Sequence, residues 1–199
     1  MFSLTGDDSN SYNNSNSNTM STDGSIIRAI HTPGHTDDSI CLYHQEDQAL
    51  FTFDSILGHG TAVFENLSQY ISSLQLLLRD LNNDNNNNND ARADTQLTKL
   101  YPGHGPVVDD GQALIRQYIA HRLEREEQLI KLFREGGGEG KGEGEDKRSW
   151  TVDQLLEKVY PPHVWEMARR GVLLHLHKLE VDGEIRKSQR EGVDIWTLL

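Results

Sequence analysis

Cysteine and long apolar runs are scarce in this chain of 199 residues. Hydrophobic residues make up 35% of it, and no apolar run approaches the roughly 20 residues that a transmembrane helix needs. Cys41 is the single cysteine, so it forms no disulfide within the chain and is expected to be a buried, inert thiol in a reducing compartment. The first residues lack the basic-then-apolar order of a signal peptide. These features predict a cytoplasmic protein with no membrane span.

Positive charge is also in short supply. Lysine and arginine number 19 against 31 acidic residues, which gives a formal net charge of -12. Such a balance works against sequence-blind binding to nucleic acid or to an anionic membrane surface. It leaves open a small neutral substrate, or a carrier protein that has a basic patch.

Low-complexity segments divide the chain. Residues 1–24 are mostly Ser, Asn, Asp and Thr, too polar to offset chain entropy, and are expected to be a disordered tail. Residues 82–94, nearly all Asn and Asp, are expected to be a solvent-exposed insertion. Residues 136–148, rich in Gly, Glu and Lys, are expected to be a flexible linker. Two folded parts are therefore predicted, at 25–135 and 149–199.

The first part predicts an α/β (α+β) arrangement. Short apolar runs predict strands at 26–30, 40–44, 49–53 and 99–101. Apolar residues at helical spacing predict a helix over 66–81, with Ser72, Ser73 and Arg79 facing solvent. A second, longer helix is expected over 111–134, with Asp110 as its N-cap.

The second part has the element order of a winged helix. Helices are expected over 152–159, 164–169 and 172–182, with Leu173, Leu174, Leu176 and Leu179 in the core. Two strands of a β-ribbon are expected at 184–187 and 194–197, around a charged turn. Three helices followed by a ribbon are typical of a winged-helix-like domain.

Two histidines follow Pro-Gly turns, and an acidic residue lies between them in the sequence. The segments are Thr32-Pro33-Gly34-His35-Thr36, an apolar run ending at Asp54, and Tyr101-Pro102-Gly103-His104-Gly105. Loops on a rigid sheet commonly present functional side chains, and Pro-Gly turns fix their backbone. Imidazole nitrogen with carboxylate oxygen suits zinc or a similar divalent ion. The set predicts metal ligands, although either histidine alone would more simply be a turn residue.

The other histidines allow plainer interpretations. His59, between two glycines, either lines a substrate cleft as a catalytic residue or is an ordinary loop residue. His31 is expected on a strand, and His121 is expected to be a structural or solvated helix residue. Thr36 and Asp37 either orient a ligand or begin the next strand. The tail histidines are expected to be packing or surface residues: His163, His175 and His177.

Together these motifs resemble the second half of a metallo-β-lactamase-fold hydrolase. The matching segments are 32–36, 51–54, 57–65, 101–106 and 118–122. Within that superfamily, residues 25–199 are most similar to the β-lactamase-like protein 2 group and to fungal atrochrysone carboxyl acyl-carrier-protein thioesterases. The resemblance implies an αββα sandwich with two metal ions, usually zinc. It also implies that His35 binds the first metal, that Asp54 bridges both and that His104 binds the second.

The chain departs from that family in two places. A His-x-His-x-Asp-His cluster, the family's first set of ligands, has no counterpart upstream of His35. Each metal would keep two protein ligands, one of them shared, whereas a stable zinc site needs three or four. The chain alone is therefore expected to bind metal poorly and to hydrolyse little, as a truncated gene model or a natural fragment would. Phe53 also stands where relatives usually have Gly, which could shift the carboxylate of Asp54.

Three functions remain open on these residues. The resemblance favours hydrolysis of a thioester on an acyl carrier protein, in polyketide or secondary-metabolite biosynthesis. The second function is cleavage of single-stranded RNA, for which a basic groove and stacking aromatics are expected. The third is a non-catalytic fragment that serves as an interaction module or forms a homo-oligomer. Half a sandwich would leave one sheet face uncovered and strand edges unpaired.

Overall fold

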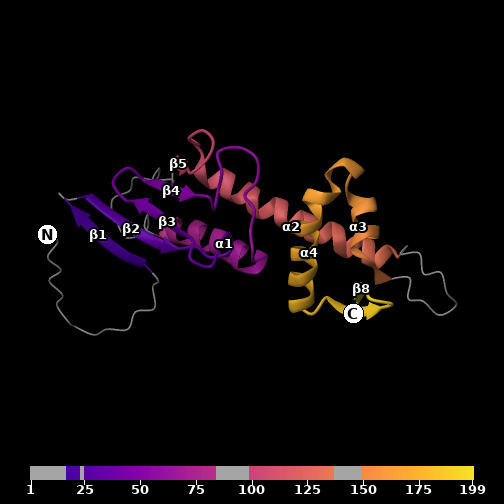
Figure 1. Ribbon diagram of the computed structural model, residues 1–199. Coiled ribbons are helices and arrows are strands. Elements are labelled where there is room, and N and C mark those ends of the chain that lie inside the picture. The colour runs from indigo at the N-terminus through magenta and orange to yellow at the C-terminus, as the bar shows by residue number, and fades with distance from the viewer. Residues whose placement is uncertain (1–16, 23–24, 84–98, 137–148) are drawn as a thin grey trace, which may run out of the picture.

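The computed structural model describes residues 17–22, 25–83, 99–136 and 149–199. Figure 1 shows a β-sheet with helix α1 at one end and a smaller helical part with a β-ribbon at the other end. The long helix α2 runs from one part to the other. In the described part of the chain, no helix is both long and apolar enough to cross a membrane.

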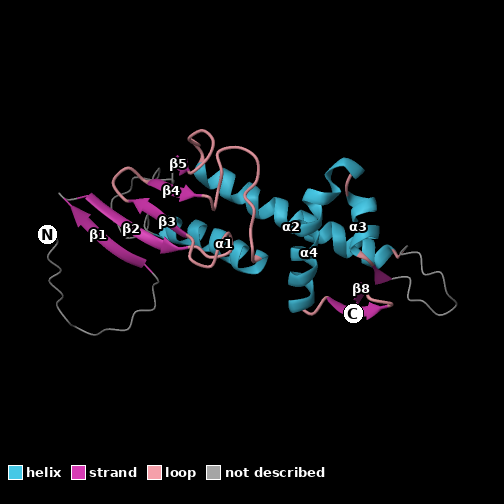
Figure 2. Cartoon of the chain, viewed as in Figure 1, coloured by secondary structure: helices cyan, strands magenta, loops and turns pink. Residues whose placement is uncertain are grey.

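A five-stranded mixed sheet forms the first part, in the spatial order β1-β2-β3-β4-β5 (Figure 2). Neighbouring strands from β1 to β4 pair antiparallel, and β4 pairs with β5 in parallel. The parallel pair matters most for the site, because the carboxyl ends of β4 and β5 meet at one edge of the sheet. The strands are β1 (Ser17–Thr22), β2 (Ser25–His31), β3 (Ile40–His44), β4 (Ala49–Phe53) and β5 (Lys99–Pro102).

Helices α1 (Leu67–Asn83) and α2 (Gly111–Glu135) contribute to the core beneath one face of this sheet. Asp110 caps α2, since its carboxylate accepts a hydrogen bond of 2.9 Å from the amide of Ala113. The core side chains alternate along the strands as one sheet face requires. They include Ile30, Cys41, Tyr43, Leu50, Leu67, Leu74, Leu100 and Ile115.

The opposite face of the sheet leaves large apolar side chains in solvent. Ile27, Ile40 and Phe51 are 38%, 43% and 37% exposed. Register places Ile27 opposite His44, and Phe51 opposite both Leu42 and Tyr101. Residues directly opposite each other share a face, so these side chains form one open surface, which is the uncovered face expected of half a sandwich.

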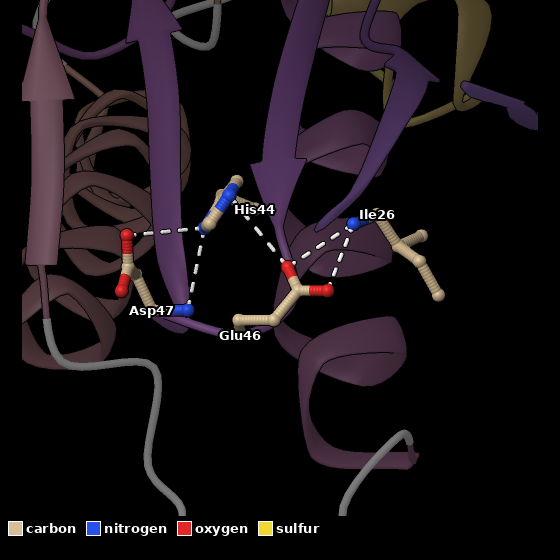
Figure 3. Close-up of polar contacts among 4 residues, drawn as sticks. All are labelled: Ile26, His44, Glu46 and Asp47. Atoms are coloured by element: carbon tan, nitrogen blue, oxygen red, sulfur yellow. Dashed lines mark hydrogen bonds and ion pairs between the residues drawn. The ribbon is translucent and has the colours of Figure 1, made fainter. Parts of the chain in front are cut away.

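A cluster of polar contacts links the β3–β4 turn to the start of β2 (Figure 3). The two carboxylate oxygens of Glu46 accept hydrogen bonds of 2.9 and 3.1 Å from the amide of Ile26. The ring of His44 lies between Glu46, at 3.6 Å, and Asp47, at 3.2 Å. The turn therefore satisfies a backbone donor of β2 itself, which is a structural role.

The second part has its own core, to which α2 also contributes. Leu129, Ile130 and Phe133 of α2 pack there with Trp150, Leu156 and Trp196. The two cores therefore meet along α2. The remaining elements are β6 (Ser149–Trp150), α3 (Val152–Val159), a 3-10 turn (Pro162–Val164), α4 (Trp165–Val181), β7 (Ile185–Arg190) and β8 (Val193–Leu198), with the strands in the order β6-β8-β7.

Most predicted elements are confirmed, and four expectations are wrong. Leu173, expected in the core, is 40% exposed, because it lies on the face of α4 that carries the exposed His177. Residues 17–22, placed in a disordered tail, form β1 against β2, because pairing at an edge needs only backbone hydrogen bonds. The helices expected at 164–169 and 172–182 are the single helix α4, since Gly171 does not interrupt it. Ser73, expected in solvent, is 5% exposed, and its hydroxyl donates to the carbonyl of Pro33 at 2.7 Å. The remaining expectations for 1–16, 84–94 and 137–148 lie outside the described residues.

Candidate functional site

Asp54 and His104 come together at the carboxyl ends of the two parallel strands. Asp54 follows β4, His104 follows β5, and Oδ1 of Asp54 lies 3.4 Å from Nε2 of His104. Backbone hydrogen bonds hold the two loops together, from Gly103 to the carbonyl of Phe53 at 2.8 Å and from Gly58 to the carbonyl of His104 at 2.9 Å. The fold thus fixes the backbones that carry this pair.

Gly103 is what allows the close approach of these two loops. A Cβ atom at this position would lie 2.8 Å from Oδ1 of Asp54 and 3.1 Å from the carbonyl carbon of Phe53. Both separations are shorter than ordinary van der Waals contact. The glycine of the second Pro-Gly turn is therefore required by packing against the Asp54 loop.

Phe53 adopts an unusual backbone conformation directly before Asp54. Its φ of +48° lies in the left-handed region, which favours glycine, and β4–β5 pairing is irregular between Phe51 and Phe53. Phe53 is 45% exposed, so burial of its side chain offsets only part of the strain. The glycine that the family resemblance implies at this position would adopt this φ without strain, whereas Phe53 does not.

His35 is held by the loop that precedes α1. Its Nδ1 lies 2.8 Å from the carbonyl oxygen of Val63, which can only accept, so Nδ1 donates and Nε2 is left as the acceptor nitrogen. The carbonyl of Gly34 accepts from the amides of Glu65 and Asn66 at 2.8 and 3.1 Å, which ties the His35 turn to the same loop. A backbone carbonyl of this kind commonly orients a metal-binding histidine.

A shallow cavity of about 380 Å³ contains His35 and Asp54 in its wall. Thr36, Ser39, Phe53 and Ser55 complete most of that wall. The hydroxyl of Thr36 donates to the carboxylate of Asp38 at 2.7 Å and lies 2.7 Å from the hydroxyl of Ser39, so it stabilises the turn. The structure thus brings His35 to the same cavity as Asp54, and brings His104 to Asp54 itself.

The donor types suit zinc, but their number does not make a complete site. Within the described ranges no group of three or more His, Cys, Asp or Glu side chains could hold a metal ion. Structural zinc sites use four protein ligands and catalytic ones about three. The described residues therefore do not fit a zinc ion without further donors.

The other predicted residues have mainly structural surroundings. His59 is exposed and packs beside Gly105, where a Cβ atom would lie 2.3 Å from its Nδ1. His31 ends β2, and its Nε2 lies 2.8 Å from the carbonyl of Asp37. His121 is exposed on α2, and partial burial with the nearby charge of Arg122 lowers its pKa.

Two tyrosines support the Asp54 loop, and the sequence did not single them out. The hydroxyl of Tyr70 donates to the carbonyl of Ser55 at 2.6 Å, and burial raises the pKa of Tyr70. The hydroxyl of Tyr118 accepts from the amide of Leu57 at 3.1 Å and donates to the carbonyl of Gly60 at 3.2 Å. Helical periodicity marks Tyr70 as a core residue but gives no sign of the carbonyl it binds.

Comparison with known proteins matches both parts of the chain. A family described as "Beta-lactamase associated winged helix domain" matches residues 151–196. A Beta-lactamase-like protein 2 homolog from Drosophila melanogaster is 35% identical over 170 residues, which are 85% of this chain and 51% of that protein. An atrochrysone carboxyl ACP thioesterase from Aspergillus chevalieri is 34% identical over 181 residues, or 89% and 53% of the two chains.

Solved structures show the same fold. A Beta-lactamase domain protein from Burkholderia ambifaria gives a TM-score of 0.65 at 18% identity, covering 92% of this chain and 50% of that one. A metallo-beta-lactamase family protein from Thermus thermophilus gives 0.62 at 20% identity, covering 92% and 52%. This chain therefore spans about half the length of the curated relatives that it matches.

Proposed function

Because this chain belongs to the metallo-β-lactamase superfamily, we propose that it provides part of the active site of a metal-dependent hydrolase that acts on acyl-carrier-protein thioesters. The main support for this proposal is the position of Asp54 and His104 at the carboxyl ends of parallel strands, where Oδ1 of Asp54 lies 3.4 Å from Nε2 of His104. His35 lines the same cavity as Asp54. His35, Asp54 and His104 would be metal ligands. The residues that complete the set would come from outside the described ranges.

Each of the three side chains has a distinct part in this arrangement. The carbonyl of Val63 fixes the ring of His35, so its Nε2 keeps a free lone pair. Asp54 carries the negative charge of the site and lies beside His104. A divalent metal at such a site would activate water for attack on a carbonyl group. These three residues alone do not support hydrolysis, because they do not hold a metal by themselves.

The thioester is favoured over single-stranded RNA by the pairing of cations in the winged helix. Several of its basic side chains already face a carboxylate. The pairs are Arg169 with Asp153, Lys178 with both Glu126 and Asp182, and Lys187 with Asp194. Affinity for RNA depends on cations that can neutralise phosphates, and the whole chain carries a net charge of -12. One of the named relatives is, in addition, an acyl-carrier-protein thioesterase.

The decisive experiment joins the chain to the part of a relative that it does not match. A chimera would join residues 25–199 to the half of the Aspergillus chevalieri thioesterase that this chain does not match. Its turnover of an acyl-carrier-protein thioester and of a single-stranded RNA would be measured in parallel. We expect thioester hydrolysis that Asp54→Asn abolishes and that Asp109→Asn leaves unchanged, because Asp109 is an exposed residue beside Lys99, at the start of β5. RNA cleavage in place of thioester hydrolysis, with the same dependence on Asp54, would support the alternative function.

The open sheet face favours a third function, that of a non-catalytic interaction module. Ile27, Ile40 and Phe51 form an exposed apolar surface, and the donor set is incomplete among the described residues. Such surfaces mark protein interfaces or aggregation sites. A folded chimera that binds metal but hydrolyses neither substrate would support this function over both enzymes.

A further inference from the structure

A second cavity lies where the two parts of the protein meet, away from Asp54 and His104. It has a volume of about 170 Å³, and its wall comes from residues 61–64, from α2 and from α4. Val63 contributes to this wall, and its carbonyl also holds the ring of His35. The cavity is thus next to the proposed site but built from different side chains.

The charges in the wall of this cavity are all positive. Arg122, Arg125 and Arg170 line it, together with His121 and His175, and its wall contains no Asp or Glu among the described residues. This is unusual in a chain whose net charge is -12. The carboxylate of Glu65 lies 4.0 Å from Arg170 in an exposed ion pair. Such exposed pairs are weak, so Arg170 remains available to a ligand.

Arg122 is a buried cation without an acidic partner among the described residues. It is 8% exposed, donates to the carbonyl of Ala62 at 3.0 Å and lies over the ring of Phe64 at 4.6 Å. Its Nε has no hydrogen-bond partner in the described part of the chain. A buried charge is costly unless it is paired, and a water molecule would satisfy a hydrogen bond but not the charge. An anion next to the guanidinium would offset the part of this cost that the Ala62 carbonyl and the Phe64 ring leave.

His175 supplies a second unsatisfied group in the same wall. It is 3% exposed, its Nδ1 has no hydrogen-bond partner among the residues described, and its ring meets the edge of Phe64 at 6.5 Å. Burial, followed by the charge of Arg122, lowers the pKa of His175 to about 3, so the ring is neutral. A neutral imidazole can still donate one hydrogen bond. The buried side chains of Arg122 and His175 and the outer Arg125 and Arg170 therefore line one small cavity.

We propose that this cavity binds a small organic anion, whose carboxylate or phosphate group accepts hydrogen bonds from Arg122 and His175. Phe64 and Leu174 form apolar wall for the body of the ligand. A neighbouring cavity of about 440 Å³ shares Thr61, His121 and Arg122 with the first, and its wall also contains Glu124. The positive charge selects an anion, and the small volume excludes a bulky headgroup.

The test titrates the complete chain with sodium hexanoate and, separately, with inorganic phosphate. Sodium chloride at matched ionic strength controls for screening. Binding is followed through the NMR signals of the His175 ring, with the thermal midpoint as a second readout. We expect a saturable shift of the ring with at least one probe. The probe that binds more tightly identifies the headgroup as carboxylate or phosphate.

Three variants decide whether the named residues hold the anion. Arg122→Lys should weaken binding at least tenfold, and Arg170→Gln at least threefold. Arg186→Gln, which removes an exposed cation from β7, should leave binding unchanged. If Arg122→Lys does not fold, the anion affinities of Arg170→Gln and Arg186→Gln are compared instead. The proposal is overturned if neither probe shifts the His175 ring in a saturable way, or if Arg170→Gln and Arg186→Gln bind alike.

Discussion

Oδ1 of Asp54 lies 3.4 Å from Nε2 of His104, although the two residues are far apart in the sequence. Parallel pairing of β4 with β5 produces this contact, because it brings the ends of both strands to one edge. Both side chains are at least half exposed, at 50% and 73%. An ion pair so exposed contributes about 0–1 kcal/mol to stability. The pair therefore adds little to stability, as is expected if both residues are the metal ligands proposed above.

Replacement of Gly103 should disturb this pair specifically. In Gly103→Ala the added Cβ would lie 2.8 Å from the carboxylate of Asp54 and 3.1 Å from the backbone of Phe53. Overpacking of this kind typically costs about 1–3 kcal/mol. Gly171→Ala is the matched control, since it lies inside α4 with no atom within 4 Å of the new methyl group. We expect it to stabilise by about 0.5–1 kcal/mol. Chemical denaturation measures the free energy of unfolding of both variants. Equal changes in the two variants would show that the close contact at Gly103 has no effect on stability.

Phe53→Gly should stabilise the protein. The φ of +48° at this position is unfavourable for a residue that has a Cβ atom, and strain of this kind costs about 1–3 kcal/mol. Part of that gain is lost because glycine makes the unfolded chain more flexible, so we expect a net increase of about 0.5–1 kcal/mol in the free energy of unfolding. Phe53→Ala keeps the Cβ atom and should give no increase. A similar gain in both variants would mean that the exposed ring, rather than the backbone, is responsible.

His175 should make the protein sensitive to mild acid. Its pKa of about 3 in the folded chain lies below the ordinary value of 6.5, so the unfolded chain binds a proton first as the pH falls. Stability from the neutral ring is complete above the unfolded pKa and decreases between about pH 6.5 and pH 3. Between pH 7 and pH 5 this amounts to about 2 kcal/mol.

His175→Gln should remove most of that decrease, and His177→Gln, on the exposed side of α4, should not. His121, whose pKa is also lowered, is present in both variants and cancels in the comparison. Urea unfolding at pH 7, 6 and 5 measures the slope. Parallel slopes for the two variants would show that the ring of His175 is not the group responsible.

The uncovered sheet face should cause self-association. Ile27 and Ile40 are 38% and 43% exposed on that face. We expect the chain to form oligomers at micromolar concentration and to bind a hydrophobic dye. The double variant Ile27→Thr, Ile40→Thr should reduce both, since threonine keeps the β-branched shape that strands favour. Replacement of Val181 and Val193 by threonine controls for exposed apolar residues of the second part. Sedimentation velocity that shows a monomer in the unmodified chain would contradict this expectation.

The sequence predicted what depends on local pattern. Alternation and helical spacing located β2 to β5, α1, α2 and the β-ribbon, and turn chemistry marked His35 and His104. It did not predict β1, because pairing through the backbone needs no apolar pattern in Ser17–Thr22. It predicted a break at residues 170–171 that α4 does not have, since packing of Val172, Leu176 and Leu179 in the second core holds the helix together.

Contacts between residues far apart in the sequence were the other feature that the sequence did not predict. The left-handed backbone of Phe53 results from how β4 meets β5, and no local pattern encodes it. Arg122 and His175 belong to different predicted parts of the chain, and only the packing of α2 against α4 places both in one cavity. His175 was accordingly expected to be a packing or surface residue. It is buried, and its unpaired Nδ1 becomes apparent only in the folded structure, among the residues described.

Zinc content, measured by elemental analysis after dialysis against zinc-free buffer, tests the proposed metal centre most directly. The 199-residue chain should retain well under one zinc ion, and the chimera should retain about two, as expected for a two-metal hydrolase. Asp54→Asn in the chimera should lower that content, whereas Asp109→Asn should not. Tight retention of two zinc ions by the chain alone would contradict the expectation that its donor set is incomplete. A chimera whose zinc content does not depend on Asp54 would contradict the assignment of His35, Asp54 and His104 as part of a shared metal centre.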